Sequence, residues 1–248
     1  MYYTNTLVVL SVICIYLLWR KRARYTWLSY LFPTICFTIF GTMEFMSFNS
    51  KGSPRPWEFN LEHISNIWIW NTAIEDVVFN IVLATLLFII YISLDRRIDS
   101  QPSHLGKLIS IAVLMLYASG LYMFGNEFGR YLCFRMSIGI LGIILVYKTW
   151  DIKLFWTAFL LFIIPTMAWE IWAGNTEVQQ WFYREGNEYS PLMSDLFWFQ
   201  IGKAWYNLEI FPGYYVSGLV FFEGTLALLI RNLRRHQNDQ KRIRPQQY

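Results

Sequence analysis

Charged residues are scarce in this chain of 248 residues, because Asp, Glu, Lys and Arg together make up only 15% of it. Soluble domains usually carry about a quarter charged residues. Hydrophobic residues account for 55% of the chain and aromatic residues for 19%, including 12 Trp. Aromatic rings of this kind favour the membrane–water boundary. The composition therefore argues against an ordinary soluble domain and predicts an integral, all-α membrane protein.

Metal-binding and nucleotide-binding patterns are also lacking. The three cysteines all fall within apolar runs without a CxxC spacing, and His63, His104 and His236 lie far apart in the sequence. Zinc sites and disulfide frameworks need closer or more regular spacings. No GxGxxG or GxxxxGK[ST] motif is present. We therefore expect no metal and no cofactor, and any chemistry should depend on carboxylates, aromatic rings and amides.

The first apolar run, Leu7 to Trp19, is followed rather than preceded by basic residues, at 20–24. Signal peptides carry their positive charge before the apolar stretch. The run is therefore interpreted as a retained first helix with its N-terminus outside. The basic tail, Arg231 to Arg244, resembles the polybasic segments that follow membrane helices and contact lipid. We expect no nucleic-acid partner.

Apolar runs long enough to cross a bilayer recur along the whole chain. A spanning helix needs roughly 20 mostly apolar residues. The short link after the fourth run predicts that the fourth and fifth helices form a hairpin. The segment 196–209 is too polar to span and is predicted to be an amphipathic or re-entrant helix. The seven runs lie near 3–19, 27–43, 71–94, 108–124, 132–147, 154–172 and 213–230.

The basic residues predict how these helices are oriented in a cell membrane. With the N-terminus outside, fifteen of the 21 Lys and Arg residues fall on the cytoplasmic side, as the positive-inside rule requires. The C-terminal tail is then cytoplasmic. A multi-pass protein with seven crossings is consistent with this distribution.

A weak internal repeat is present. Helix two ends near Glu44 and is followed by Trp57, and helix six ends near Glu170 and is followed by Trp181. An odd helix between the halves would keep them parallel. The predicted organisation is a first three-helix half at 1–95, a linker helix at 105–125, a second three-helix half at 130–232 and a basic cytoplasmic tail at 233–248.

Five acids lie in or beside the apolar runs: Glu44, Glu75, Asp76, Glu170 and Glu223. An acid at the centre of a membrane helix costs roughly 2.5–3.5 kcal/mol, so each is a candidate functional residue. The adjacent pair, Glu75 and Asp76, is the strongest candidate, because each charge opposes ionisation of the other. One could then act as a general acid and the other as a base.

The remaining acids have simpler alternatives. Glu44 could face water at a helix end, and Glu223 could form a buried hydrogen bond between helices. Glu209 is an alternative to Glu223 as the counterpart of Glu75 in the second half.

One stretch resembles a known family. Trp57-Glu58-Phe59-Asn60, followed by Ile74-Glu75-Asp76-Val77-Val78-Phe79, is similar to the integral-membrane lycopene cyclases, which have a Trp-x-Phe-Asn loop followed by a Pro-Ile-Glu-Glu-x-x-Phe-Phe helix start. The resemblance covers about residues 27–95. Ala73, Asp76 and Asn80 replace the family's proline, second glutamate and second phenylalanine.

The resemblance implies a redox-neutral, acid-initiated cyclisation of the end group of a linear carotenoid such as lycopene. It implies three kinds of partner: a lipophilic polyprenoid substrate, the lipid bilayer and other enzymes of the carotenoid pathway. A terpene cyclase for another prenyl substrate and a non-enzymatic transporter or receptor-like bundle are the alternatives. Candidate catalytic residues are Glu75, Asp76, Glu223, Glu170 and Glu44, and candidate substrate-binding residues are Trp57, Asn60, Trp70, Phe79 and Phe222.

Overall fold

A computed structural model gives the fold of the chain. It describes residues 2–22, 26–48, 58–59, 64–69, 72–94, 103–125, 127–175, 181–182, 198–202, 204–207 and 212–243. Side chains at 44–48 and 230–243 lie outside this description, although their backbone is helical.

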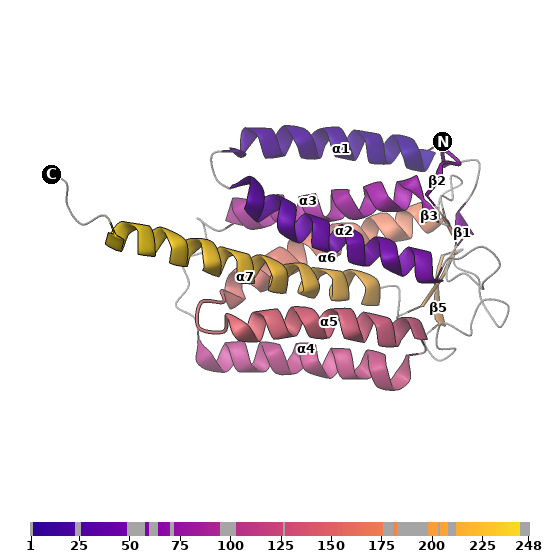
Figure 1. The fold of residues 1–248 in the computed structure, drawn as a ribbon. Helices are drawn as coiled ribbons and strands as arrows, with labels where there is room; N and C mark the ends of the chain where they lie inside the picture. Colours follow the sequence, from indigo (N-terminus) through magenta and orange to yellow (C-terminus); the bar gives the residue numbers. More distant parts are fainter. Residues whose placement is uncertain are drawn as a thin grey trace.

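Seven α-helices make up most of the described residues (Figure 1). Five of them, α1 and α3 to α6, are long and apolar enough to cross a membrane, while α2 and α7 contain shorter apolar stretches, Trp27–Met43 and Gly213–Leu229. The predicted all-α membrane class is confirmed to this extent, and the count of seven crossings stays a prediction. The bounds are α1 Tyr2–Arg20, α2 Trp27–Phe48, α3 Ile74–Leu94, α4 His104–Phe124, α5 Glu127–Leu145, α6 Ile152–Asn175 and α7 Gly213–Ile243.

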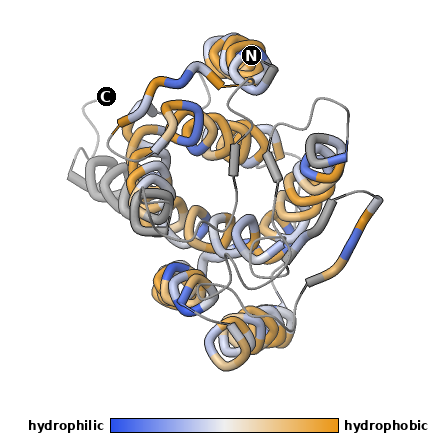
Figure 2. Tube along the Cα trace, turned by 90° about the vertical axis from the view of Figure 1, so that its right-hand side faces the viewer, coloured by the Kyte–Doolittle hydropathy of each residue, from blue (hydrophilic) through white to orange (hydrophobic). Residues whose placement is uncertain are grey.

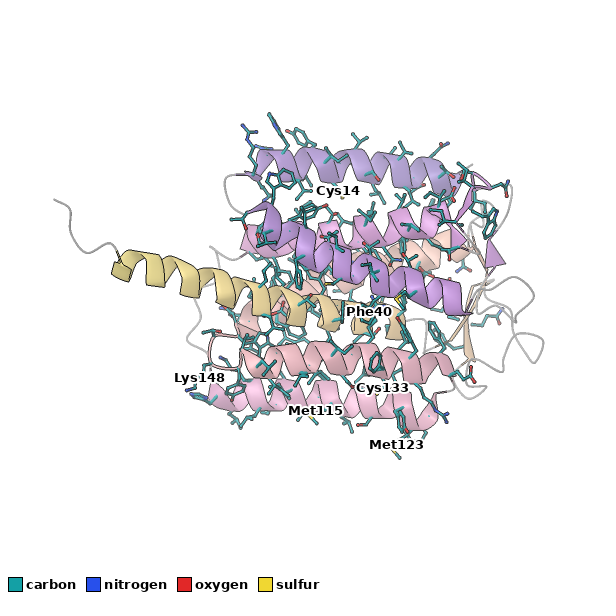
Figure 3. The ribbon with its side chains drawn as sticks, in the orientation of Figure 1. Cys14, Phe40, Met115, Met123, Cys133 and Lys148 are labelled. Atoms are coloured by element: carbon teal, nitrogen blue, oxygen red, sulfur yellow. The ribbon has the colours of Figure 1, made fainter. Side chains whose placement is uncertain are left out.

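Hydrophobic side chains cover the outside of the bundle as well as its core. In the end-on view, much of each described helix has the orange colour of hydrophobic residues (Figure 2). On α4, Met115 and Met123 point away from the other helices and are 52% and 73% exposed (Figure 3). Exposing so much apolar surface to water would be unfavourable, whereas lipid tails accept it. The surface is therefore that of a membrane-embedded bundle.

Helices α5 and α7 form the closest pair in the bundle. A Cβ atom added to Gly139 would lie 2.3 Å from the carbonyl oxygen of Val220, and one added to Gly224 would lie 2.3 Å from the carbonyl oxygen of Gly139. Small residues of this kind let helix backbones touch in membranes. These two glycines hold α7 against α5.

The other helices pack on this pair or on α3. Helix α2 packs on α3 and α7, α1 and α6 pack on α3, and α4 packs on α5. The predicted α4–α5 hairpin is confirmed. Successive helices run in opposite directions, so the starts of α3, α5 and α7 lie at the same end as the short strands (Figure 1). We call this the strand end, and the end that carries the α5–α6 turn, at 146–151, the turn end.

Three short antiparallel pairs lie at the strand end. Strand β1 (Glu58–Phe59) pairs with β4 (Trp181–Phe182), β2 (Trp68–Ile69) pairs with β3 (Thr72–Ala73), and β5 (Trp198–Ile201) pairs with β6 (Ala204–Asn207).

The β5–β6 hairpin corrects the prediction of a helix at 196–209. Its turn contains Gly202 with φ +64°, a conformation that glycine adopts readily. The stacked rings of Phe199 and Tyr206, 5.9 Å apart, join the two strands on one face. The aromatic residues therefore pair across strands instead of forming the apolar side of a helix.

The order of the elements occurs twice along the chain. Helices α1 and α2 precede β1, β2 and β3, and α3 follows them. Helices α5 and α6 similarly precede β4, β5 and β6, and α7 follows. Helix α4 lies between the two series.

Candidate active site

Helix α3 begins with two buried carboxyl groups, on Glu75 and Asp76, which are only 2% and 3% exposed. The β2–β3 hairpin leads directly into the helix, and Asn66 makes the preceding bend with φ 59°. Acidic residues in the first helical turn face the unsatisfied N–H groups there, which is favourable for negative charge. The hairpin and the helix start therefore direct this acidic pair into the protein.

Glu75 is held by hydrogen bonds from two other segments. The hydroxyl of Thr4 on α1 donates to Glu75 Oε1 at 2.7 Å, and the backbone N–H of Ser65 donates to the same oxygen at 2.6 Å. Two donors on one oxygen stabilise the carboxylate form. The other oxygen, Oε2, has no hydrogen-bond partner among the described residues.

Glu170, near the end of α6, belongs to the same region. It is 1% exposed, and the Tyr215 hydroxyl on α7 donates to its Oε2 at 2.5 Å. Trp169, the residue before Glu170, stacks on Phe79 of α3 with ring centres 5.5 Å apart, so the end of α6 meets the start of α3 here. The structure therefore brings together three of the five predicted catalytic acids, from helices α3 and α6. We call Glu75, Asp76 and Glu170 the acidic cluster.

Asn80 lies one helical turn after Asp76 and is completely buried. The Tyr214 hydroxyl on α7 donates to Asn80 Oδ1 at 2.6 Å. A Cβ atom at Gly41 of α2 would come within 2.5 Å of the same oxygen, so only glycine leaves room for this amide. Asn80 thus joins α2, α3 and α7 beside the acidic cluster.

Arg135 on α5 is a buried residue that sequence reasoning missed. It is 0% exposed, and its guanidinium carbon lies 4.9 Å from the centre of the Phe37 ring and 5.2 Å from that of Tyr214. A Cβ atom at Gly218 would lie 2.7 Å from Arg135 Nη2. The sequence did contain a signal for Arg135, because the residue lies within the fifth apolar run. An arginine inside a membrane helix needs partners in the bundle interior.

Aromatic rings line the interior. Phe79, a predicted substrate-binding residue, stacks on Trp169 of α6 with ring centres 5.5 Å apart. Phe222 is buried on α7 between Phe37, at 6.2 Å, and Tyr91, at 6.4 Å. Both rings are therefore interior residues, and Phe79 is the one on the helix that carries the acidic pair.

Glu223 lies in a different environment, toward the turn end. The Trp150 indole N–H in the α5–α6 turn donates to Glu223 Oε1 at 3.0 Å, and both side chains are buried. Lys107 of α4 holds the same turn by donating to the carbonyl oxygens of Tyr147 and Lys148 at 2.7 and 3.2 Å. The structure thus separates Glu223 from the acidic cluster and connects it to a turn.

Tyr206 of β6 attaches the β5–β6 hairpin to α6. Asn175 Nδ2 donates to the Tyr206 hydroxyl at 3.1 Å and to the carbonyl oxygen of Ile171 at 2.9 Å. Burial, with a smaller contribution from the Glu170 charge, raises the pKa of Tyr206 to about 12. The hairpin is therefore fixed next to the acidic cluster.

Four of the predicted site residues lie wholly or partly outside the described part of the chain. Trp57, Asn60 and Trp70 lie outside the described residues, as does the side chain of Glu44, whose backbone is in α2. Within the described part of the chain, no three His, Cys, Asp or Glu side chains are placed to hold a metal ion.

Comparisons with protein-family models, with curated proteins and with solved structures find no match for this chain. The arrangement of the acids and rings is therefore the basis for a functional argument.

Proposed function

We propose that the chain is a membrane-embedded cyclase that closes the end group of a linear polyprenoid, with a carotenoid such as lycopene as the first substrate to test. The observation that carries the proposal is the acidic cluster, which is buried beside aromatic rings in an apolar bundle. A substrate that water cannot dissolve would reach such a site from the bilayer. The sequence resemblance to lycopene cyclases points to the same chemistry.

The proposed reaction uses Asp76 as the acid. Its proton passes to a terminal alkene carbon, so that an O–H bond breaks, a C–H bond forms and a carbocation remains. A second alkene attacks the cation and closes a six-membered ring. Glu75 or Glu170 then removes a proton from the ring and restores a double bond. The product is an isomer of the substrate, and no electrons are exchanged.

The assignment of Glu75 as a base follows from its hydrogen bonds. The donors from Thr4 and Ser65 favour its carboxylate form. Asp76 lies next to this charge in a buried position, which favours its protonated form. An adjacent acid and base with opposite protonation states is the arrangement that general acid–base catalysis needs.

Aromatic faces would stabilise the cation. The quadrupole of an aromatic ring attracts a nearby cation by about 0.5–2 kcal/mol, and more strongly where water is excluded. Phe79 and Trp169 form a stacked pair near the start of α3 and the end of α6. They are the candidate rings for this role.

A duplicated architecture is part of the proposal, and its support is the repeated order of elements and the pairing of β1 with β4, which follow α2 and α6. The proposed orientation, with the N-terminus outside, rests on the distribution of Lys and Arg along the chain. Packing is also reciprocal, since α2 contacts α7 and α6 contacts α3. Pro33 lies in the first third of α2 and Pro165 just past the middle of α6, so within these two described helices the prolines do not lie at matching places, as the helix breaks of many transporters do.

The test is expression of the full chain in cells that accumulate lycopene, with pigment analysis by chromatography. We expect a cyclic isomer of lycopene in cells with the wild-type chain and its loss with Asp76→Asn or Glu75→Gln. Glu127→Gln is the matched control, because Glu127 is an exposed acid at the same end of the bundle. Unchanged lycopene beside well-expressed, folded protein would rule out the carotenoid substrate.

A further inference from the structure

Two buried polar atoms on one face of α3 lack hydrogen-bond partners among the described residues. They are Oδ2 of Asp76 and Nδ2 of Asn80. The side chains are 3% and 0% exposed, so neither atom can be satisfied by bulk solvent. A buried polar group without a partner costs about 1–3 kcal/mol. Two such groups one helical turn apart need an explanation.

The two residues are four positions apart, so they lie one turn apart on the same side of the helix. That side faces α2 and α7, because Asn80 contacts Gly41 and accepts a hydrogen bond from Tyr214. The unpartnered atoms therefore face the interior beside the acidic cluster and not the lipid.

The hydrogen-bonding capacity of the two atoms is complementary to one kind of ligand. Asn80 Nδ2 carries only N–H donors, and the amide oxygen Oδ1 already accepts the Tyr214 hydroxyl. In its protonated form, Asp76 also donates from its carboxyl group. Two donors one turn apart match an oxygen atom that accepts two hydrogen bonds. A purely hydrocarbon end group would leave both donors unsatisfied.

We infer that Asp76 and Asn80 form a subsite for an oxygen acceptor, such as a hydroxyl or keto oxygen, on the end of a bound polyprenoid. The inference rests on the proposed function, because it assigns a substrate class to the same site: an oxygenated polyprenoid binds more tightly than its hydrocarbon counterpart. Ordered water could also satisfy these two atoms. Comparing an oxygenated ligand with its hydrocarbon counterpart distinguishes a ligand oxygen from water.

The experiment measures affinity instead of turnover, so it remains informative if no cyclisation occurs. The purified full chain in detergent is titrated with lycopene and with 1-hydroxy-1,2-dihydrolycopene, followed by carotenoid absorbance. We expect the hydroxylated ligand to bind about tenfold more tightly, a difference equivalent to one satisfied buried hydrogen bond. Equal affinities for the two ligands would mean that water alone occupies the subsite and would overturn the inference.

Three variants identify the atoms responsible. Asn80→Leu removes the amide donor, so the preference should fall to about one. Tyr214→Phe removes the hydrogen bond to Oδ1 and should keep the preference. Asp76→Asn retains a donor and should also keep the preference, although it removes the proton needed for cyclisation.

A stability measurement completes the design. If Asn80→Leu fails to fold, Asn80→Ala provides a smaller replacement that also lacks the donor. Thermal unfolding in detergent identifies the folded variants. A preference that survives in a folded Asn80 variant without the donor would contradict the subsite.

Discussion

The two ends of the bundle each contain buried carboxyl groups, but their surroundings differ. At the turn end, Glu223 accepts the Trp150 indole N–H, and Lys107 fixes the turn that carries this indole. At the strand end, Glu75 and Asp76 each retain an oxygen without a hydrogen-bond partner among the described residues. The comparison suggests that Glu223 stabilises a turn, while the acidic cluster is available to a ligand.

The largest expected effect is on activity at the strand end. Asp76→Asn should lower cyclisation at least about 100-fold, because general acid catalysis contributes roughly 10²–10⁴-fold. Glu223→Gln, which preserves an acceptor for Trp150, should change the rate by less than about threefold. Product formation per folded protein is measured by chromatography. A loss in Glu223→Gln as large as that in Asp76→Asn would remove the distinction between the two ends.

Substitutions at the turn end should change the stability of the protein more than its activity. Glu223→Leu leaves the Trp150 N–H buried without its acceptor, which should lower the free energy of unfolding by about 1–3 kcal/mol. Denaturation in detergent measures the loss, and Glu127→Leu is the exposed control. Activity per folded molecule should remain near the wild-type value. An unchanged midpoint in Glu223→Leu would argue against the structural role.

Gly41 offers a smaller and more local perturbation of the strand end. A methyl group at this position would come within 2.5 Å of the Asn80 amide and displace it. Gly41→Ala should therefore reduce activity about tenfold, since small misplacements near the chemistry are costly. Gly120→Ala is the matched control, because a Cβ atom there has no neighbour within 4 Å. Equal activity in the two variants would show that the position of Asn80 is unimportant.

The smallest expected effect concerns Tyr206 and pH. Its pKa rises from 10 to about 12 on folding, so the folded state binds this proton more tightly than the unfolded state. The resulting stability is complete below pH 10 and is lost between pH 10 and about 12. Tyr206→Phe should lose less stability than wild type across this window. Thermal unfolding from pH 9 to 12 measures the difference, and parallel curves for the two proteins would contradict it.

Local sequence patterns accounted for the helices and failed at one aromatic segment. Hydropathy runs located all seven helices, since each run is a property of consecutive residues. At 198–207 the same hydrophobicity was compatible with a helix or a hairpin. Cross-strand packing of Phe199 on Tyr206 and the φ of Gly202 favour the hairpin, and neither is visible in composition.

The candidate site was only partly predictable. The Glu75–Asp76 pair was visible because two adjacent acids interrupt apolar sequence. A charge count does not show that the Arg135 guanidinium lies against the Phe37 and Tyr214 rings inside the bundle. Nor does any local pattern show that Tyr214, 134 positions away, donates to Asn80.

The sequence by itself determined the membrane class, the helices and the acidic pair, because hydropathy and adjacent charges act between near neighbours in the chain. Tertiary structure alone decided which acids meet. Glu170 joins the pair because α3 packs on α6, and Glu223 is separated from it because its position on α7 faces the α5–α6 turn. Contacts between distant helices depend on close approach at glycines, to the Asn80 side chain at Gly41 and to the α7 backbone at Gly139, and no local pattern records them.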